Sequence, residues 1–441
     1  MKTVSFLCEV ITPLFMSGSN VQTFELRPSE IKGMMRFWWR AVKALDDKEK
    51  LREEETDIFG GIKPTNLKSP VSIRIIQNLN DTSEQKAVKL GENIQGRINQ
   101  RAGIKYLFYS TFSLKFAGER LVRKYLQPGT KFELILSCRD DDYEKFQKVL
   151  AAFWLTVNLG GLRTRSKRGA GDIRILQPKE LKLREETLSF VKDDDNNVTK
   201  WIVDNFYVVR KIINGCKDFC SSYSNLSLSR FLISKESFNS WEDALDDLGK
   251  KYIDFRRKNS SKKPQIGVFG LPVNYRRTRI TWKKVNDQNE DSDHDRRTSP
   301  LIFKVFRFGN KYRWMVLRMS GEFLPEGSVL NLSGRTQKPD FSLIDEFWNI
   351  LKEHAVEDIL SVPETLNKLA AEIKKELDAR KVILFGSRAR GDATKKSDID
   401  IAVVTGKAVS NFEKIANVDL VNLNKVSNDL REKIIKEGIE L

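Results

Sequence analysis

The sequence is poor in histidine, cysteine and long apolar runs. Only two histidines and four cysteines occur in 441 residues, which disfavours Ser–His and Cys–His catalysis and leaves too few nearby ligands for a zinc site. The cysteines are few and scattered, which does not describe a disulfide framework. Apolar runs such as Ala151–Leu155 are far shorter than the ~20 residues that a membrane span needs. We therefore expect either carboxylate and metal chemistry or no catalysis, and no membrane partner.

The amino terminus runs directly into alternating apolar residues. Val4, Phe6, Cys8 and Val10 share one face of a half-buried strand. A signal peptide would instead begin with a basic stretch and an apolar run. We expect a cytoplasmic protein without a signal peptide.

Positive charge is concentrated in the first 360 residues. The chain has 77 Lys and Arg against 60 Asp and Glu, and of the net charge of +17, residues 1–360 carry +15 and residues 361–441 carry +2. One interpretation is a polyanionic partner, with nucleic acid favoured. The other is a solvated surface rich in Lys and Glu, as in thermophilic proteins.

The order of predicted elements indicates an α+β protein. The elements predicted for the first 180 residues are a strand at residues 2–11, a helix from about Glu30 to Leu45 with Ser29 as its N-cap, strands at Val71–Ile76 and Lys131–Ser137, a helix at Asp141–Asn158 and a strand at Asp172–Leu176. This is the split βαβ order of a ferredoxin-like domain. We place that domain at residues 1–195, a less legible α+β domain at 196–360, and a short unit at 361–441.

The short unit contains a compact motif of glycine, serine and aspartate. The apolar strand Lys381–Phe385 leads into Gly386 and Ser387, whose backbone N–H groups and hydroxyl form a phosphate cradle. Asp398 and Asp400 alternate along the next strand and can share a metal ion. A third carboxylate, Asp419, lies in another predicted strand. Carboxylates beside a triphosphate cradle are the arrangement for nucleotidyl transfer.

This stretch resembles the minimal nucleotidyltransferases of the polymerase-β superfamily. The resemblance covers Phe385–Val404 and extends to Asp419. It implies a small α/β domain in which Gly386 and Ser387 bind the triphosphate of an NTP. It also implies that Asp398, Asp400 and Asp419 are catalytic and hold Mg²⁺. A folded module without activity of its own is the alternative.

One predicted helix carries a basic stripe beside an apolar face. Lys32, Arg36, Arg40 and Lys43 are spaced four, four and three residues apart and fall on one side. Four cations along one face of a helix repel one another, which is unfavourable unless a polyanion or several carboxylates face them.

A glycine-rich loop supplies the second basic segment. Between Gly160 and Gly171 it contains four cations within six residues, namely Arg163, Arg165, Lys167 and Arg168. Glycines let the backbone approach a phosphate, and arginine and lysine side chains can bind its neighbours. An ordinary exposed loop is the alternative.

Together these segments resemble the RAMP superfamily of CRISPR effector proteins, and most closely the two-domain RAMP subunit of type III-B Cmr complexes. The resemblance rests on Arg27–Val42, Gly160–Asp172 and Arg296–Leu301. It implies two ferredoxin-like (RAMP/RRM-like) domains ahead of the nucleotidyltransferase-like domain. It also implies a non-catalytic subunit that binds the 3′ part of crRNA and single-stranded target RNA beside other Cmr subunits, without a cofactor.

The resemblance and the basic pattern give a set of predicted RNA-binding residues. They are Lys32, Arg36, Arg40, Arg163, Arg165, Lys167, Arg168, Arg276, Arg277, Arg296 and Arg297. An aromatic ring, Tyr275, precedes Arg276 and Arg277, so a base could stack there. Two further functions remain open: a nucleotidyltransferase that transfers NMP to RNA or to a partner protein, and an RNA-processing endonuclease, which the scarcity of histidine disfavours.

Overall fold

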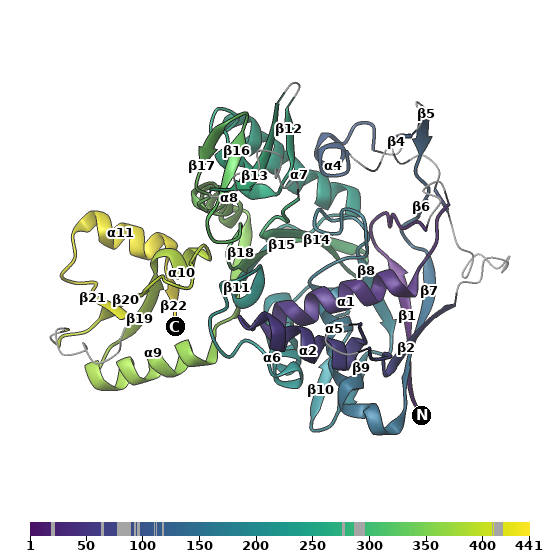
Figure 1. Cartoon of the computed structure of the whole chain (residues 1–441), viewed down its shortest axis with the longest axis horizontal. Helices are drawn as coiled ribbons and strands as arrows, with labels where there is room; N and C mark the ends of the chain where they lie inside the picture. The colour runs from purple at the N-terminus through teal and green to yellow at the C-terminus, as the bar shows by residue number, and fades with distance from the viewer. Residues whose placement is uncertain are drawn as a thin grey trace.

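The computed structural model describes most of the chain as three consecutive α+β units (Figure 1). The described residues are 1–18, 23–62, 66–76, 90–91, 94, 98–109, 111, 113–116, 119–275, 278–285, 296–407, 409 and 418–441. Within these residues, no helix is long and apolar enough to cross a membrane.

The first unit is built on a four-stranded antiparallel sheet. Its core elements are β1 (Lys2–Val10), α1 (Pro28–Lys43), β2 (Val71–Ile76), β7 (Lys131–Cys138), α5 (Tyr143–Asn158) and β8 (Ile173–Gln177). The sheet order is β2-β7-β1-β8, which places the strands as second, third, first and fourth with helices after the first and third. This is the ferredoxin-like arrangement that the sequence predicts.

Additional elements decorate the first unit. They are α2 (Lys48–Phe59), β3 (Leu90–Gly91), α4 (Ala102–Leu107), β4 (Ser113–Phe116), β5 (Glu119–Val122), β6 (Tyr125–Leu126), η1 (Asp140–Asp142), β9 (Glu180–Leu183) and β10 (Glu186–Ser189). Of these, α2 packs beside α1, and α4 packs on α7 of the second unit.

The second unit repeats the ferredoxin-like order. Its main elements are α6 (Val198–Ile213), β11 (Asn225–Ser234), α7 (Trp241–Lys258), β14 (Leu301–Phe308), β15 (Lys311–Ser320), α8 (Ser342–Glu353) and β18 (Ala355–Ser361). The sheet order β14-β15-β11-β18 again places the strands second, third, first and fourth. A smaller sheet adjoins it, formed by β12 (Val273–Tyr275), β13 (Thr278–Lys284), β16 (Ser328–Leu332) and β17 (Arg335–Gln337), with η2 (Gln265–Phe269) preceding it.

The two ferredoxin-like units share their apolar interior. One buried cluster joins Trp38 and Val42 of α1 to Phe231 of β11 and Met315 of β15. The units are therefore one body, which we call the two-domain body (residues 1–361).

The last unit, which we call the module (residues 362–441), has its own sheet. Its elements are α9 (Glu364–Leu377), β19 (Lys381–Phe385), α10 (Gly386–Arg390), β20 (Ile399–Val404), β21 (Val418–Asn422), α11 (Asn428–Glu437) and β22 (Ile439–Glu440). The sheet order is β21-β20-β19-β22, and β20 and β21 are parallel. In Figure 1 the module lies to one side of the two-domain body, with α9 and α10 nearest to it.

Two local expectations are settled by the backbone. The first helix begins two residues earlier than predicted, with Arg27 as N-cap and Pro28 in its first turn, so the assignment of Ser29 as N-cap is wrong. Proline fits the first turn because its fixed φ suits a helix and its missing N–H has no intrahelical partner there. The apolar pattern of residues 203–213 fits either a strand or a helix, and in the structure these residues belong to α6.

Candidate nucleic-acid interface and carboxylate site

The basic stripe of α1 is faced by carboxylates from the next helix. Arg36 and Arg40 both donate to the same oxygen of Glu55, Oε1, at 2.5 Å each. Lys43 pairs with Glu54 at 2.5 Å. Lys32 is half-buried, and burial together with the charge of Arg36 lowers its pKa. The stripe requires either a polyanionic ligand or facing carboxylates. The structure provides carboxylates from the chain itself.

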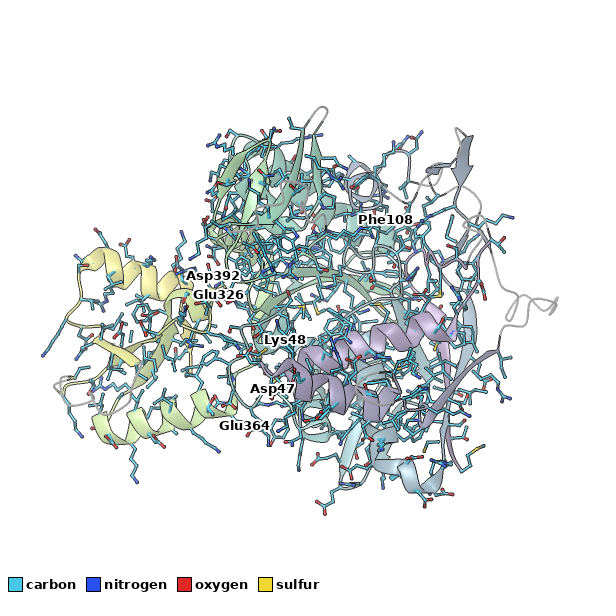
Figure 2. The ribbon with its side chains drawn as sticks, viewed as in Figure 1. Asp47, Lys48, Phe108, Glu326, Glu364 and Asp392 are labelled. Atoms are coloured by element: carbon cyan, nitrogen blue, oxygen red, sulfur yellow. The ribbon has the colours of Figure 1, made fainter. Side chains whose placement is uncertain are left out.

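A large cleft of about 1450 Å³ opens beside the stripe, between α1, α2, the second unit and the module. Arg36, Arg40 and Arg297 line it, so the structure brings together three of the predicted RNA-binding residues. Figure 2 shows Asp47 and Lys48 at the start of α2, and Glu326 close to the junction with the module. Six basic and six acidic residues line the cleft, so its charge is mixed rather than strongly positive.

The glycine-rich loop folds against α1. Arg163 pairs with Glu30 at 2.5 Å and remains exposed. Arg165 lies over the ring of Tyr109, 4.4 Å from its centre. The structure therefore places the two predicted basic segments side by side.

The last two cations of the loop point inward. The Lys167 ammonium is enclosed, has no hydrogen-bond partner among the residues that the structure describes, and lies 4.1 Å from the centre of the Phe37 ring. Burial, with the charge of Arg168, lowers the pKa of Lys167 to about 7. Arg168 donates to the carbonyls of Phe269 at 2.6 Å and Leu301 at 3.1 Å. The guanidinium of Arg168 thus joins the first unit to the second.

The remaining predicted RNA-binding residues belong to the second unit. Arg296 is exposed, whereas Arg297 is half-buried and lies over the Trp282 ring at 5.6 Å. Arg276 and Arg277 lie outside the described residues.

The predicted carboxylates gather at one edge of the module sheet. Asp400 on β20 and Asp419 on β21 are register partners on parallel strands. Asp398, which was predicted on the strand, comes one residue before β20 begins. Burial, then the charges of Asp419 and Asp398, raise the pKa of Asp400. The three groups thus repel one another electrostatically.

Gly386 follows β19, directly beside Asp400. Its φ is +72°, and a Cβ at this position would overlap Oδ2 of Asp400, so only glycine fits. Ser387 is half-buried in α10, which is only five residues long. The next residue, Arg388, donates to the carbonyls of Ser397 at 2.6 Å and Asp398 at 3.0 Å.

The segment that carries the glycine motif contacts the two-domain body. The guanidinium of Arg388 lies over the ring of Phe219 at 4.4 Å. Close by, the N–H of Gly321 donates to the carbonyl of Gly391 at 3.1 Å, and Arg318 donates to the carbonyl of Arg390. The module is therefore anchored through the same loop that carries its glycine motif.

The donor set of this edge suits a hard cation such as Mg²⁺, which prefers carboxylate oxygens. Burial is the main cause of the raised pKa of Asp400, and the neighbouring charges of Asp419 and Asp398 add to it. In the described part of the chain, however, no three His, Cys, Asp or Glu side chains are grouped closely enough to hold a metal ion. The carboxylates are neighbours that have not converged on one point.

Comparison with known proteins identifies the family. Residues 7–171 match the RAMP superfamily. The CRISPR system Cmr subunit Cmr1-2 of Pyrococcus furiosus is 32% identical over 198 residues, which are 40% of this chain and 97% of that protein. This chain belongs to the Cmr subunits of the RAMP superfamily.

A second Cmr subunit of Pyrococcus furiosus, Cmr1-1, is 27% identical over 313 residues, 68% of this chain and 82% of that protein. The crystal structure of Cmr1 from the same organism in its apo form superposes with a TM-score of 0.55 at 20% identity, and covers 82% of this chain and 99% of that one. This likeness concerns the fold. Residues 367–441 match a different family, polymerase beta nucleotidyltransferase. The chain is thus a Cmr subunit with an appended nucleotidyltransferase module.

Several residues of this Cmr subunit were not predicted as part of a site. Glu55 belongs to the acidic run Glu53–Glu55, which could have been recognised as the partner of the stripe. Arg388 lies inside the glycine motif and was equally visible. Tyr106 and Tyr109 carry no local signal that separates them from core aromatics.

Proposed function

We propose that this Cmr subunit binds RNA within a type III-B CRISPR effector complex, contacting the 3′ part of crRNA and the paired target RNA. The supporting observation is the contact between the glycine-rich loop and α1, through Arg163 and Glu30. It leaves Arg163 exposed beside half-buried Lys32 and Arg165. Side chains of this kind bind phosphates through charge-assisted hydrogen bonds.

The proposed interface does not include all predicted residues equally. Arg36 and Arg40 are neutralised in part by Glu55, and Lys167 and Arg168 support the loop from within. Arg163 is exposed although it pairs with Glu30, and together with Lys32, Arg165 and Arg296 it supplies the accessible charge. Other Cmr subunits are the expected protein partners.

Ultraviolet crosslinking of the full chain to single-stranded RNA, mapped by mass spectrometry, tests this interface. We expect crosslinked peptides from α1 and from the loop between Gly160 and Gly171. Crosslinks confined to the module would overturn the assignment and favour an RNA-modifying enzyme.

A second function is favoured by the contact between Gly386 and Asp400. We infer that the module transfers NMP from an NTP to an acceptor hydroxyl on RNA or on a partner protein. The acceptor oxygen would bond to the α-phosphorus as its O–H proton passes to water, while the bond between the α-phosphorus and the bridging oxygen breaks and pyrophosphate leaves. Asp398, Asp400 and Asp419 would hold Mg²⁺, which neutralises phosphate charge and activates the hydroxyl when bound. Gly386 and Ser387 would contact the triphosphate.

Incubation of the full chain with labelled ATP, Mg²⁺ and RNA tests the module. Label on RNA or protein should disappear in Asp400→Asn. It should persist in Asp429→Asn, a control in the first turn of α11. Label that survives Asp400→Asn would exclude this site as its source.

A further inference from the structure

A second, smaller pocket lies where the two ferredoxin-like units meet, on the other side of the glycine-rich loop. Its volume is about 290 Å³, near the lower limit for ligand sites. We call it the seam pocket. Its walls come from α4, the loop, α7 and the segment from η2 into β12. No residue of the seam pocket lines the large cleft beside α1.

Aromatic rings form much of the seam pocket. Tyr106 and Tyr109 are 37% and 58% exposed, although both are large and partly apolar. Tyr252 forms the floor and contacts Tyr106 edge-on, with ring centres 5.8 Å apart. Exposed rings beside a hollow offer flat faces on which another planar group can stack.

The described charged residues that line the seam pocket are all basic. Arg165, Arg168 and Arg256 line the seam pocket, and none of its described lining residues is acidic. Arg168 donates to backbone carbonyls, which do not neutralise its charge. The large cleft differs, because acidic side chains there match the basic ones in number. A described lining whose charged residues are all basic favours an anionic ligand.

The guanidinium of Arg165 lies 4.4 Å from the centre of the Tyr109 ring. Arg256 lies over Tyr252 and Phe269, at 5.8 and 5.5 Å. These cation–π pairs present both a planar face and N–H donors to the seam pocket. A ligand that suits them carries a flat ring and a negative charge together.

We propose that the seam pocket receives one unstacked nucleobase of single-stranded RNA, with the adjoining phosphate held by its arginines. Proteins recognise unpaired RNA by stacking bases on aromatic rings and on guanidinium planes. An acidic peptide would satisfy the charge but leave the rings without a planar partner. This inference rests on the proposed RNA-binding function and specifies where one base is held.

The test uses the full chain and a set of single-stranded RNAs, each with one 2-aminopurine at a successive position. Stacking quenches 2-aminopurine fluorescence, so one position should be quenched strongly on binding. Tyr109→Ala should remove that quench and weaken affinity about five- to a hundredfold. Tyr109→Phe, which keeps the ring, should retain the quench. Tyr207→Ala changes a tyrosine on α6 that is 64% exposed and serves as the matched control.

The outcomes separate this inference from the function on which it rests. Unchanged quenching and affinity in both Tyr109→Ala and Arg165→Ala, while the wild-type chain still binds RNA, would overturn the pocket assignment alone. If Tyr109→Ala and Arg165→Ala lose the ability to bind an acidic peptide that the wild-type chain binds, but still bind RNA, the pocket would be reassigned to a protein partner. Absence of RNA binding by the wild-type chain would overturn the proposed function itself.

Discussion

Lys304 and Asp172 pair across the boundary between the two ferredoxin-like units, with Nζ 3.4 Å from Oδ1 and both side chains fully buried. Lys304 also donates to the carbonyl of Gly160 at 2.8 Å, and the backbone N–H of Val305 donates to Asp172 at 2.7 Å. The pair therefore fixes the glycine-rich loop to β14, and the position of the proposed RNA interface depends on it.

Lys304→Met should destabilise the chain by about 3–5 kcal/mol at pH 8, because it leaves a buried carboxylate without its partner. Burial raises the pKa of Asp172 to about 6, and loss of the ammonium raises it further. Below that pH the folded state takes up a proton and the cost falls. Chemical denaturation should show a smaller loss at pH 5 than at pH 8. Lys262→Met removes an exposed pair with Glu346 as a control; an equal loss at both pH values for Lys304→Met would contradict this account.

Lys167→Met should stabilise the chain, and more at pH 6 than at pH 9. The pKa of Lys167 is lowered to about 7 by burial, whereas the pKa of a lysine in the unfolded chain is about 10.4. Between these values the unfolded state binds more protons, so wild-type stability rises with pH, and below pH 7 the cost of burying the ammonium is fully present. Thermal unfolding at the two pH values measures the gain in Tm. A gain that does not depend on pH, or that matches Lys200→Met on the exposed surface of α6, would show that the ammonium is not enclosed.

Glu55→Gln should raise the affinity for single-stranded RNA. The carboxylate of Glu55 neutralises Arg36 and Arg40, and its removal leaves two guanidinium groups facing the large cleft without a counter-charge. The salt dependence of binding should steepen at the same time. Glu53→Gln, an exposed position on the same helix, is the control for the change in net charge. If both variants bind equally, the stripe does not contact RNA.

Gly386→Ala should abolish nucleotide transfer by the module and leave RNA binding unchanged. A Cβ at this position overlaps the Asp400 carboxylate, and the positive φ disfavours any side chain. Gly406→Ala in the same module meets no atom within 4 Å and is the control. Label transfer and RNA titration on the same preparations separate the two functions. Transfer that persists in Gly386→Ala would place the reaction elsewhere.

The local sequence pattern was sufficient to predict helices and strands, but it was insufficient to predict the contacts between them. Val71–Ile76 and Lys381–Phe385 were predicted with the bounds that the structure shows, because short apolar β-branched runs between turn signals define strands. The carboxylate that faces the α1 stripe comes from another helix, so spacing along α1 alone could not reveal it. Likewise, the sequence of the loop does not show that Lys167 and Arg168 turn inward while Arg163 stays exposed.

The carboxylate edge of the module illustrates the same distinction. Alternation in the motif was enough to predict that Asp400 has Asp398 near it. The register between β20 and β21, which places Asp419 beside Asp400, depends on strand pairing that no local pattern encodes. The contact of Arg388 with Phe219 joins residues 169 positions apart in the chain, and only the tertiary structure reveals it.

The most direct test of the central claim is the salt dependence of single-stranded RNA binding by the full chain. We predict that log K falls linearly with log salt, by about 0.7 for each phosphate contacted. The variant Lys32→Ala/Arg163→Ala/Arg165→Ala should lower that slope by about 2. The control Arg139→Ala/Lys179→Ala/Arg184→Ala, with the same loss of charge at exposed positions, should leave it unchanged. Salt-independent binding, or an equal slope in both triple variants, would contradict RNA binding by α1 and the glycine-rich loop.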